Sequence, residues 1–182
     1  AAMYYEELEK LYGKAKYYSM DPFHEGGNTE GVDLAKAGTS IMGAMKKANP
    51  EAVWVMQAWQ ANPREAMVNT LDSGDLLVLD LYSEKLPQWG DPESMWYREK
   101  GFGKHDWLYC MLLNFGGNVG LHGRMEQLVN GYYNACAHIN GKTLRGVGAT
   151  PEGIENNPMM FELLYELPWR EERFSPDIWL QG

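Results

Sequence analysis

The segment Asp75-Leu-Leu-Val-Leu-Asp-Leu81 is apolar at every position between its two aspartates. A strand with one solvated face alternates apolar and polar residues, whereas a strand that is buried on both faces is continuously apolar. The segment therefore predicts a buried strand, with helices covering one face of its sheet and a packed interior filling the other.

Strand-like segments recur on both sides of this one, with helical stretches between them. We expect further strands at residues 17–23, 52–59, 107–114 and 143–149, and helices at residues 6–11 and 32–48. This alternation implies right-handed crossovers and a parallel sheet, either an open doubly wound sheet or a barrel. No Gly-x-Gly-x-x-Gly motif follows the first strand, which argues against a dinucleotide-binding open sheet.

Two Asn-Pro pairs predict where helices begin. Asn62 and Asn157 each precede a proline. Asparagine is a favourable N-cap, and a proline at the first helical position gives up no hydrogen bond. We therefore expect one helix to begin at Pro63 and another at Pro158.

The barrel is favoured by the residues that follow the strand candidates. These positions hold carboxylates, an amide and an indole, which are Glu25, Trp59, Asp80, Asn114 and Glu152. A (β/α)8 barrel places its chemistry at the carboxyl ends of its strands. We therefore predict an α/β fold of the (β/α)8 TIM-barrel type.

The length indicates only part of such a barrel. A complete barrel has eight strands and roughly 250 residues, whereas this chain has 182 residues and five strand candidates. We expect its second half, with residues 1–169 in the barrel catalytic domain and residues 170–182 beginning a C-terminal helical region. The chain starts Ala1-Ala2 and shows no signal peptide, so we take it as a piece of a longer polypeptide. The remainder of that polypeptide would complete the barrel and cover its sheet edges.

Glu25 and Glu152 suggest glycosidic bond cleavage. That reaction needs one carboxyl group that protonates the leaving oxygen and a second, ionised carboxylate that attacks or stabilises the anomeric carbon. Each glutamate taken alone is also compatible with a solvated loop side chain. Glu155, three residues beyond Glu152, is a rival for the second role.

Five motifs in order resemble the α-N-acetylglucosaminidases of glycoside hydrolase family 89. They are Asp21-Pro-Phe-His-Glu25-Gly-Gly-Asn-Thr29, Val53-Trp-Val-Met-Gln-Ala-Trp59, Asp75-Leu-Leu-Val-Leu-Asp-Leu81, Asn114-Phe-Gly-Gly-Asn118 and Thr150-Pro-Glu152-Gly-Ile-Glu-Asn-Asn-Pro158. The resemblance implies an exo-acting retaining glycosidase that removes terminal α-linked N-acetylglucosamine from glycans, without a cofactor. It also implies a secreted or periplasmic protein if the source is bacterial, and a lysosomal one in animals.

The resemblance assigns roles to individual residues. Glu25 would be the general acid and base, and Glu152 the nucleophile. The implied substrate-binding residues are His24, Trp59, Leu81, Asn114 and Phe115. Other interpretations stay open, because His24 would also buttress Glu25, Trp59 would suit a core, and Phe115 would suit a tight turn.

Composition excludes several partners. A net charge of −9 argues against nucleic acid, whose phosphates would be repelled. No run approaches the apolar length of a membrane span, and two cysteines are too few for a disulfide framework. Histidines and carboxylates show no His-Glu-x-x-His or similar spacing, so no metal site is predicted.

Two further functions and one geometric difficulty remain. The chain would also suit a non-catalytic carbohydrate-binding protein, or a (β/α)8 glycosidase that acts on a different sugar. Glu25 follows the first strand candidate and Glu152 follows the fifth. Retention needs carboxyl groups roughly 5–5.5 Å apart, so either one strand is miscounted or the loop after Ala149 reaches inward.

Overall fold

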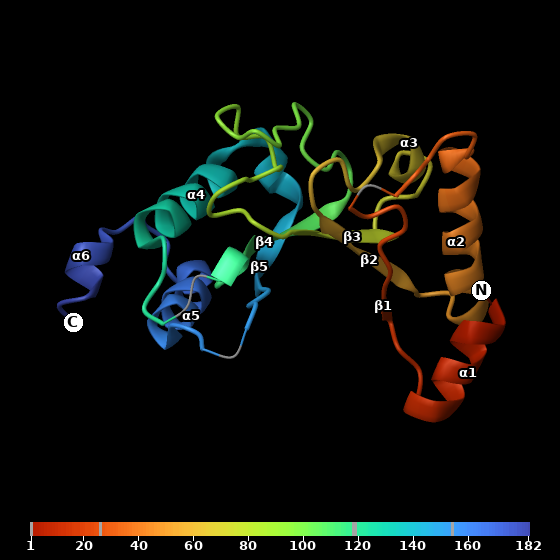
Figure 1. The fold of residues 1–182 in the computed structure, drawn as a ribbon, viewed down its shortest axis with the longest axis horizontal. Coiled ribbons are helices and arrows are strands. Elements are labelled where there is room, and N and C mark those ends of the chain that lie inside the picture. Colours follow the sequence, from red (N-terminus) through yellow and green to blue (C-terminus); the bar gives the residue numbers. More distant parts are fainter. Residues whose placement is uncertain (1, 26, 118–119, 154) are drawn as a thin grey trace. The chain divides into compact units, whose positions relative to one another are not determined.

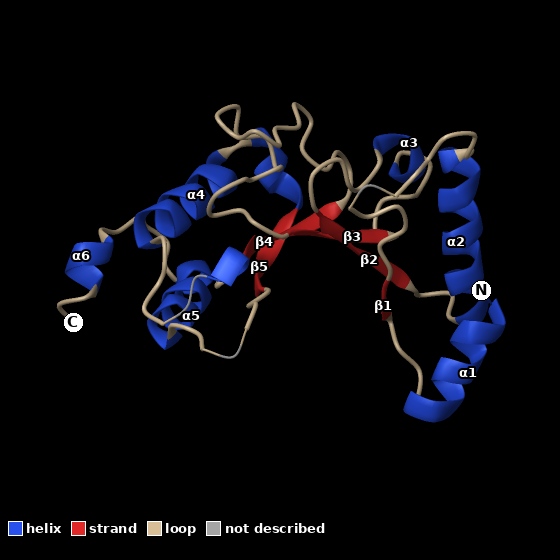
Figure 2. Cartoon of the chain, in the orientation of Figure 1, coloured by secondary structure: helices blue, strands red, loops and turns tan. Residues whose placement is uncertain are grey.

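The structure is a computed structural model that describes residues 2–25, 27–117, 120–153 and 155–182. Positions 26, 118–119 and 154 of the motifs lie outside the described residues. Helices and strands alternate along most of the chain (Figures 1 and 2). The strands are β1 (Tyr17–Ser19), β2 (Val53–Ala58), β3 (Leu76–Asp80), β4 (Asp106–Met111) and β5 (Leu144–Ala149). The α-helices are α1 (Ala2–Tyr12), α2 (Leu34–Ala48), α3 (Glu65–Val68), α4 (Met125–Ala137), α5 (Pro158–Glu166) and α6 (Pro176–Trp179), with short 3-10 turns η1 (Phe115–Gly117), η2 (Ile139–Thr143) and η3 (Leu167–Trp169).

The five strands form one sheet in the order β1-β2-β3-β4-β5. β1 and β2 pair in parallel, with Tyr17 opposite Val53, and β4 and β5 pair in parallel, with Met111 opposite Ala149. The predicted parallel sheet is confirmed, and its strands lie in sequence order. Among the described residues, no helix has the length and hydropathy needed to cross a membrane.

Two strands end earlier than the sequence predicted, because side chains replace the backbone partners. After Ser19, the carboxylate of Asp21 accepts the N–H of Gln57 at 2.6 Å. After Met111, the N–H of Leu112 donates to the carboxylate of Glu84 at 3.0 and 3.2 Å. A side chain that takes a strand N–H leaves the neighbouring backbone free to turn into a loop.

The chain divides into two compact units, of which the first comprises residues 1–78 and 104–106. In it, α2 packs against α1, α3 and β2. The indole of Trp54, fully buried on β2, donates to the carbonyl of Met20 at 2.7 Å. Asp33 caps α2 by accepting the N–H of Lys36. Flexible methionine side chains fill the irregular space between these elements. The buried methionines of this unit are Met42, Met45, Met56 and Met67.

The second unit comprises residues 79–103 and 107–182. Trp107 on β4 is fully buried and stacks on Trp89, with ring centroids 6.4 Å apart. The fully buried Tyr109 lies close to α4, since a Cβ at Gly131 would overlap with its hydroxyl oxygen. Cys110 on the same strand is buried, and burial raises the pKa of its thiol, so little reactive thiolate forms.

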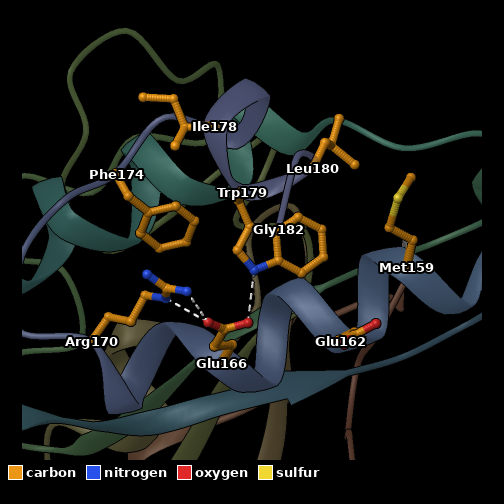
Figure 3. A pocket seen from close by; sticks show the side chains of 9 residues that line it. All are labelled: Met159, Glu162, Glu166, Arg170, Phe174, Ile178, Trp179, Leu180 and Gly182. Atoms are coloured by element: carbon orange, nitrogen blue, oxygen red, sulfur yellow. Dashed lines mark hydrogen bonds and ion pairs between the residues drawn. The ribbon is translucent and has the colours of Figure 1, made fainter.

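A hollow of about 530 Å³ lies between α5 and α6 in this unit (Figure 3). At its centre, the carboxylate of Glu166 forms an ion pair with Arg170 and accepts the indole N–H of Trp179 at 2.7 Å. Both interactions lower the pKa of Glu166. The apolar lining comes from Met159, Phe174, Ile178 and Leu180.

One of the two predicted helix starts is confirmed. Asn157 caps α5 by accepting the N–H of Met159, and Pro158 is the first helical residue. The start at Pro63 is wrong, because α3 begins at Glu65 after Arg64. Asn62 instead closes a tight turn, in which it and Trp59 exchange backbone hydrogen bonds of 2.9 and 3.2 Å.

Two glycines on α2 provide a test of the packing in the first unit. A Cβ at Gly38 would overlap with the carbonyl oxygen of Met67, whereas Gly43 has nothing within 4 Å. We expect Gly38→Ala to lower the free energy of unfolding by about 1–3 kcal/mol through overpacking. The matched Gly43→Ala should raise it by up to about 1 kcal/mol, because alanine favours the helix. Denaturant unfolding of both variants checks this, and equal effects would contradict the α2–α3 contact.

Candidate active site

His24 and Glu25 lie on the connection that follows β1. This connection is anchored where Asp21 accepts the N–H of Gln57, and burial raises the pKa of the Asp21 carboxyl group. Phe23 and Glu25 have positive φ angles of 61° and 46°, a conformation that costs free energy for residues other than glycine. Glu25 is exposed and His24 is half-buried. The His24 Nε2 is buried and has no hydrogen-bond partner among the described residues.

Trp59 directly follows β2 in the same unit. Its side chain is buried, with 8% of its surface exposed. The turn that follows holds Gln60 at a positive φ of 53°. The burial agrees with packing in a core and is equally compatible with one face of the ring lining a pocket.

The candidates of the second unit follow β3, β4 and β5. Leu81 and Asn114 are buried, with 8% and 3% of their surfaces exposed. Phe115 contacts Tyr82 edge to face, with ring centroids 5.4 Å apart. Glu152 is exposed, and its N–H donates to the carbonyl of Leu113 at 2.9 Å. The second unit therefore brings Asn114, Phe115 and Glu152 together at the carboxyl ends of β4 and β5.

Asn114 connects these two strand ends. Its amide nitrogen donates to the carbonyl of Glu155 and to the side-chain oxygen of Asn156. Its φ is +64°, which asparagine tolerates better than most residues. Its side-chain oxygen is buried and has no hydrogen-bond partner among the described residues. Asn114 thus holds the segment after Glu152 and presents an unsatisfied acceptor.

Two acids of this unit, Asp80 and Glu84, are buried. Asp80 is fully buried and accepts the N–H groups of Gln88 and Trp89 at 2.9 and 3.1 Å. Burial raises its pKa to about 7, against the effect of these bonds. Burial also raises the pKa of Glu84 to about 8. In the part of the chain that the structure describes, no three His, Cys, Asp or Glu side chains group to hold a metal ion.

The α-N-acetylglucosaminidase (NAGLU) TIM-barrel domain model matches residues 1–171. The chain belongs to the α-N-acetylglucosaminidase family. This confirms the predicted resemblance, and it confirms that the five parallel strands are part of a TIM-barrel domain.

Individual α-N-acetylglucosaminidase relatives agree with this. The human α-N-acetylglucosaminidase is 35% identical over 182 positions, covering 94% of this chain and 23% of the human protein. A family 89 glycoside hydrolase from Clostridium perfringens, solved with 2-acetamido-1,2-dideoxynojirmycin, is 34% identical over the whole chain, with a TM-score of 0.86. A Clostridium perfringens variant with two glutamates changed to glutamine, solved with its substrate GlcNAc-α-1,4-galactose, is 32% identical with the same TM-score. The chain spans about a fifth of the length of these relatives.

Three residues beside the candidate site were not predicted from the sequence. They are Tyr82, Glu84 and Arg124, which interact with one another in the second unit. Tyr82 directly follows the apolar run that predicted β3, and Glu84 lies two residues later. A glutamate so close to a buried strand could have been predicted as a buried acid. Arg124 precedes α4 and carries no comparable signal, because only the tertiary fold brings it near Glu84.

A substitution at Asn114 can separate the effect of its positive φ from the effect of its side-chain hydrogen bonds. Asn114→Gly keeps the positive φ at no strain but removes the hydrogen bonds to Glu155 and Asn156. We expect amide exchange in a peptide spanning residues 155–163 to rise about 30-fold, since the two lost bonds are worth about 1 kcal/mol each. Asn130→Ala, on the exposed face of α4, is the control and should leave that peptide unchanged. Equal exchange in both variants would contradict the conclusion that the Asn114 side chain holds the segment after Glu152.

Proposed function

We propose that the protein containing this chain is an exo-acting, retaining α-N-acetylglucosaminidase. It would hydrolyse terminal, non-reducing α-linked N-acetylglucosamine from glycans in a secreted, periplasmic or lysosomal setting. The observation that carries the proposal is the family match over residues 1–171, which includes both Glu25 and Glu152. The Clostridium perfringens relative supports it, since its substrate complex was obtained after two glutamates were replaced.

The proposed mechanism is double displacement. The ionised carboxylate of Glu152 attacks the anomeric carbon while the carboxyl group of Glu25 gives its proton to the leaving oxygen. A covalent glycosyl-enzyme forms, and Glu25 then removes a proton from the water that hydrolyses it. Each displacement inverts the anomeric carbon, so two in succession retain the α configuration. The two carboxyl groups supply the acid, the base and the nucleophile, so no cofactor is needed.

The remaining candidates would bind the sugar. Buried polar atoms without partners cost free energy, which a sugar hydroxyl or amide relieves by hydrogen bonding. His24 Nε2 and the Asn114 side-chain oxygen are such atoms among the described residues. Trp59, Leu81 and Phe115 would supply apolar surface for the sugar ring.

Azide products from the complete enzyme test the two roles. Glu152→Ala removes the nucleophile and leaves the acid, so azide should attack the vacated face and give a glycosyl azide of inverted configuration. Glu25→Ala should slow substrates with poor leaving groups by about 10²-fold or more, and azide should intercept its covalent intermediate to give the retained product. Nuclear magnetic resonance of the anomeric proton distinguishes the two azides.

Glu155→Ala is the matched control, because this exposed carboxylate lies in the same motif. It should keep hydrolysis close to that of the unaltered enzyme. The opposite azide pattern would exchange the two roles. Unchanged hydrolysis after either glutamate is replaced would mean that the carboxyl group concerned is not catalytic.

A further inference from the structure

Glu84 is a buried acid that has no part in the proposed chemistry. It lies in the turn directly after β3, with 6% of its surface exposed. Both of its carboxyl oxygens lie within hydrogen-bond distance of the N–H of Leu112, at 3.0 and 3.2 Å. Leu112 is the first residue after β4, so this side chain holds the point where the strand becomes the site loop.

Backbone hydrogen bonds hold residues 110–113 from both sides. On one side, the turn after β3 adds a backbone bond of 3.0 Å from the Ser83 N–H to the Cys110 carbonyl. On the other side, the N–H groups of Thr150 and Glu152 donate to the carbonyls of Met111 and Leu113, both at 2.9 Å. The position of the Glu152 backbone therefore depends on the strand end that Glu84 fixes.

Side chains of the same turn reach the site as well. Tyr82, two residues before Glu84, contacts the ring of Phe115 and accepts a hydrogen bond from Arg124. Burial raises the pKa of the Tyr82 phenol most, and the nearby carboxyl groups of Glu84 and Glu152 raise it further. The turn thus links Glu84 to two of the site candidates, Phe115 and Glu152.

We propose that Glu84 is a positioning residue of the active site, which fixes the end of β4 and, through it, the Glu152 backbone and the Phe115 ring. The proposal rests on the proposed function, in which Glu152 is the nucleophile. Glu84 acts through these groups and does not contact the substrate.

Glu84 does this as a neutral acid. Burial raises its pKa to about 8 from 4.5, against the hydrogen bonds of its own backbone and Leu112 and the charge of Arg124. Besides Arg124, the titratable groups that interact with it are Asp80, Tyr82, Tyr109 and Cys110. The folded state keeps a proton that the unfolded state loses, so the stabilising contribution is complete below pH 4.5 and is lost as the pH rises to about 8.

Three variants of the complete enzyme test this role. Glu84→Gln keeps the shape and the neutral charge, Glu84→Ala removes the anchor, and Glu93→Ala alters an exposed glutamate of the same connection. On an aryl α-N-acetylglucosaminide at pH 6, we expect Glu84→Ala to lower kcat about 10²-fold, with little change in KM. Glu84→Gln should stay within about threefold of the unaltered enzyme, and Glu93→Ala within about twofold.

Two measurements do not depend on turnover. Hydrogen exchange at the amides of Leu112 and Glu152 should become faster in Glu84→Ala and stay unchanged in Glu93→Ala. The Tm of the unaltered enzyme minus that of Glu84→Gln should fall as the pH rises from 5 to 9, because glutamine does not titrate. If Glu84→Ala does not fold, the Tm difference and the Glu84→Gln kinetics decide the matter.

The outcomes separate this proposal from the proposed function. An unaltered enzyme that does not hydrolyse α-N-acetylglucosaminides would contradict the proposed function, while the exchange and Tm measurements would still test the anchor. Equal kcat in Glu84→Ala and Glu93→Ala would overturn the positioning role. A loss of kcat in Glu84→Gln as large as that in Glu84→Ala would overturn the claim that Glu84 acts as a neutral acid.

Discussion

Backbone N–H groups near the carboxyl ends of the strands need partners once the ladder stops, and in this chain carboxyl groups supply them. Asp21 accepts the N–H of Gln57 and Glu84 accepts that of Leu112, while Asp80 accepts those of Gln88 and Trp89 in the connection between β3 and β4. A buried N–H without a partner costs about as much as a lost hydrogen bond. The carboxyl groups of Asp21 and Glu84 therefore determine where β1 and β4 end and where the loops that carry the candidate site residues begin.

The same loops contain the strained backbone of the chain. The described non-glycine residues with positive φ are Phe23, Glu25, Gln60 and Asn114, and all of them lie in connections that follow β1, β2 or β4. Strain of this kind persists only where surrounding contacts fix it, and it concentrates at functional sites. The exchanged hydrogen bonds of the Trp59–Asn62 turn and the amide bonds of Asn114 are such contacts.

Burial favours the protonated, neutral form of Asp80 and Glu84. Burial is the largest influence on Asp80 and Glu84, and it raises their pKa values to about 7 and about 8. A buried carboxylate without a paired cation is costly, and a neutral acid still accepts through its carbonyl oxygen. Exposed carboxylates such as Glu25 and Glu152 are free of this cost. Burial thus distinguishes Asp80 and Glu84, which bind backbone N–H groups, from the exposed candidate acids of the site.

The sequence by itself determined the features that depend on neighbouring residues. The apolar run of β3 predicted a buried strand, the alternation of elements predicted the parallel order, and the Asn157-Pro158 pair predicted the start of α5. The motifs around Glu25 and Glu152 predicted the family. Each signal depends on periodicity, a local cap or a short motif, so a stretch of a few residues contains it.

The tertiary structure alone decided which polar groups anchor the strand ends. The same Asn-Pro pattern begins a helix at Asn157 but closes a turn at Asn62, where Trp59 offers backbone partners. The ends of β1 and β4 and the role of Glu84 depend on bonds between residues 36 and 28 positions apart. Such bonds form only when folding brings distant segments together, and burial then sets both their strength and the protonation of the acids.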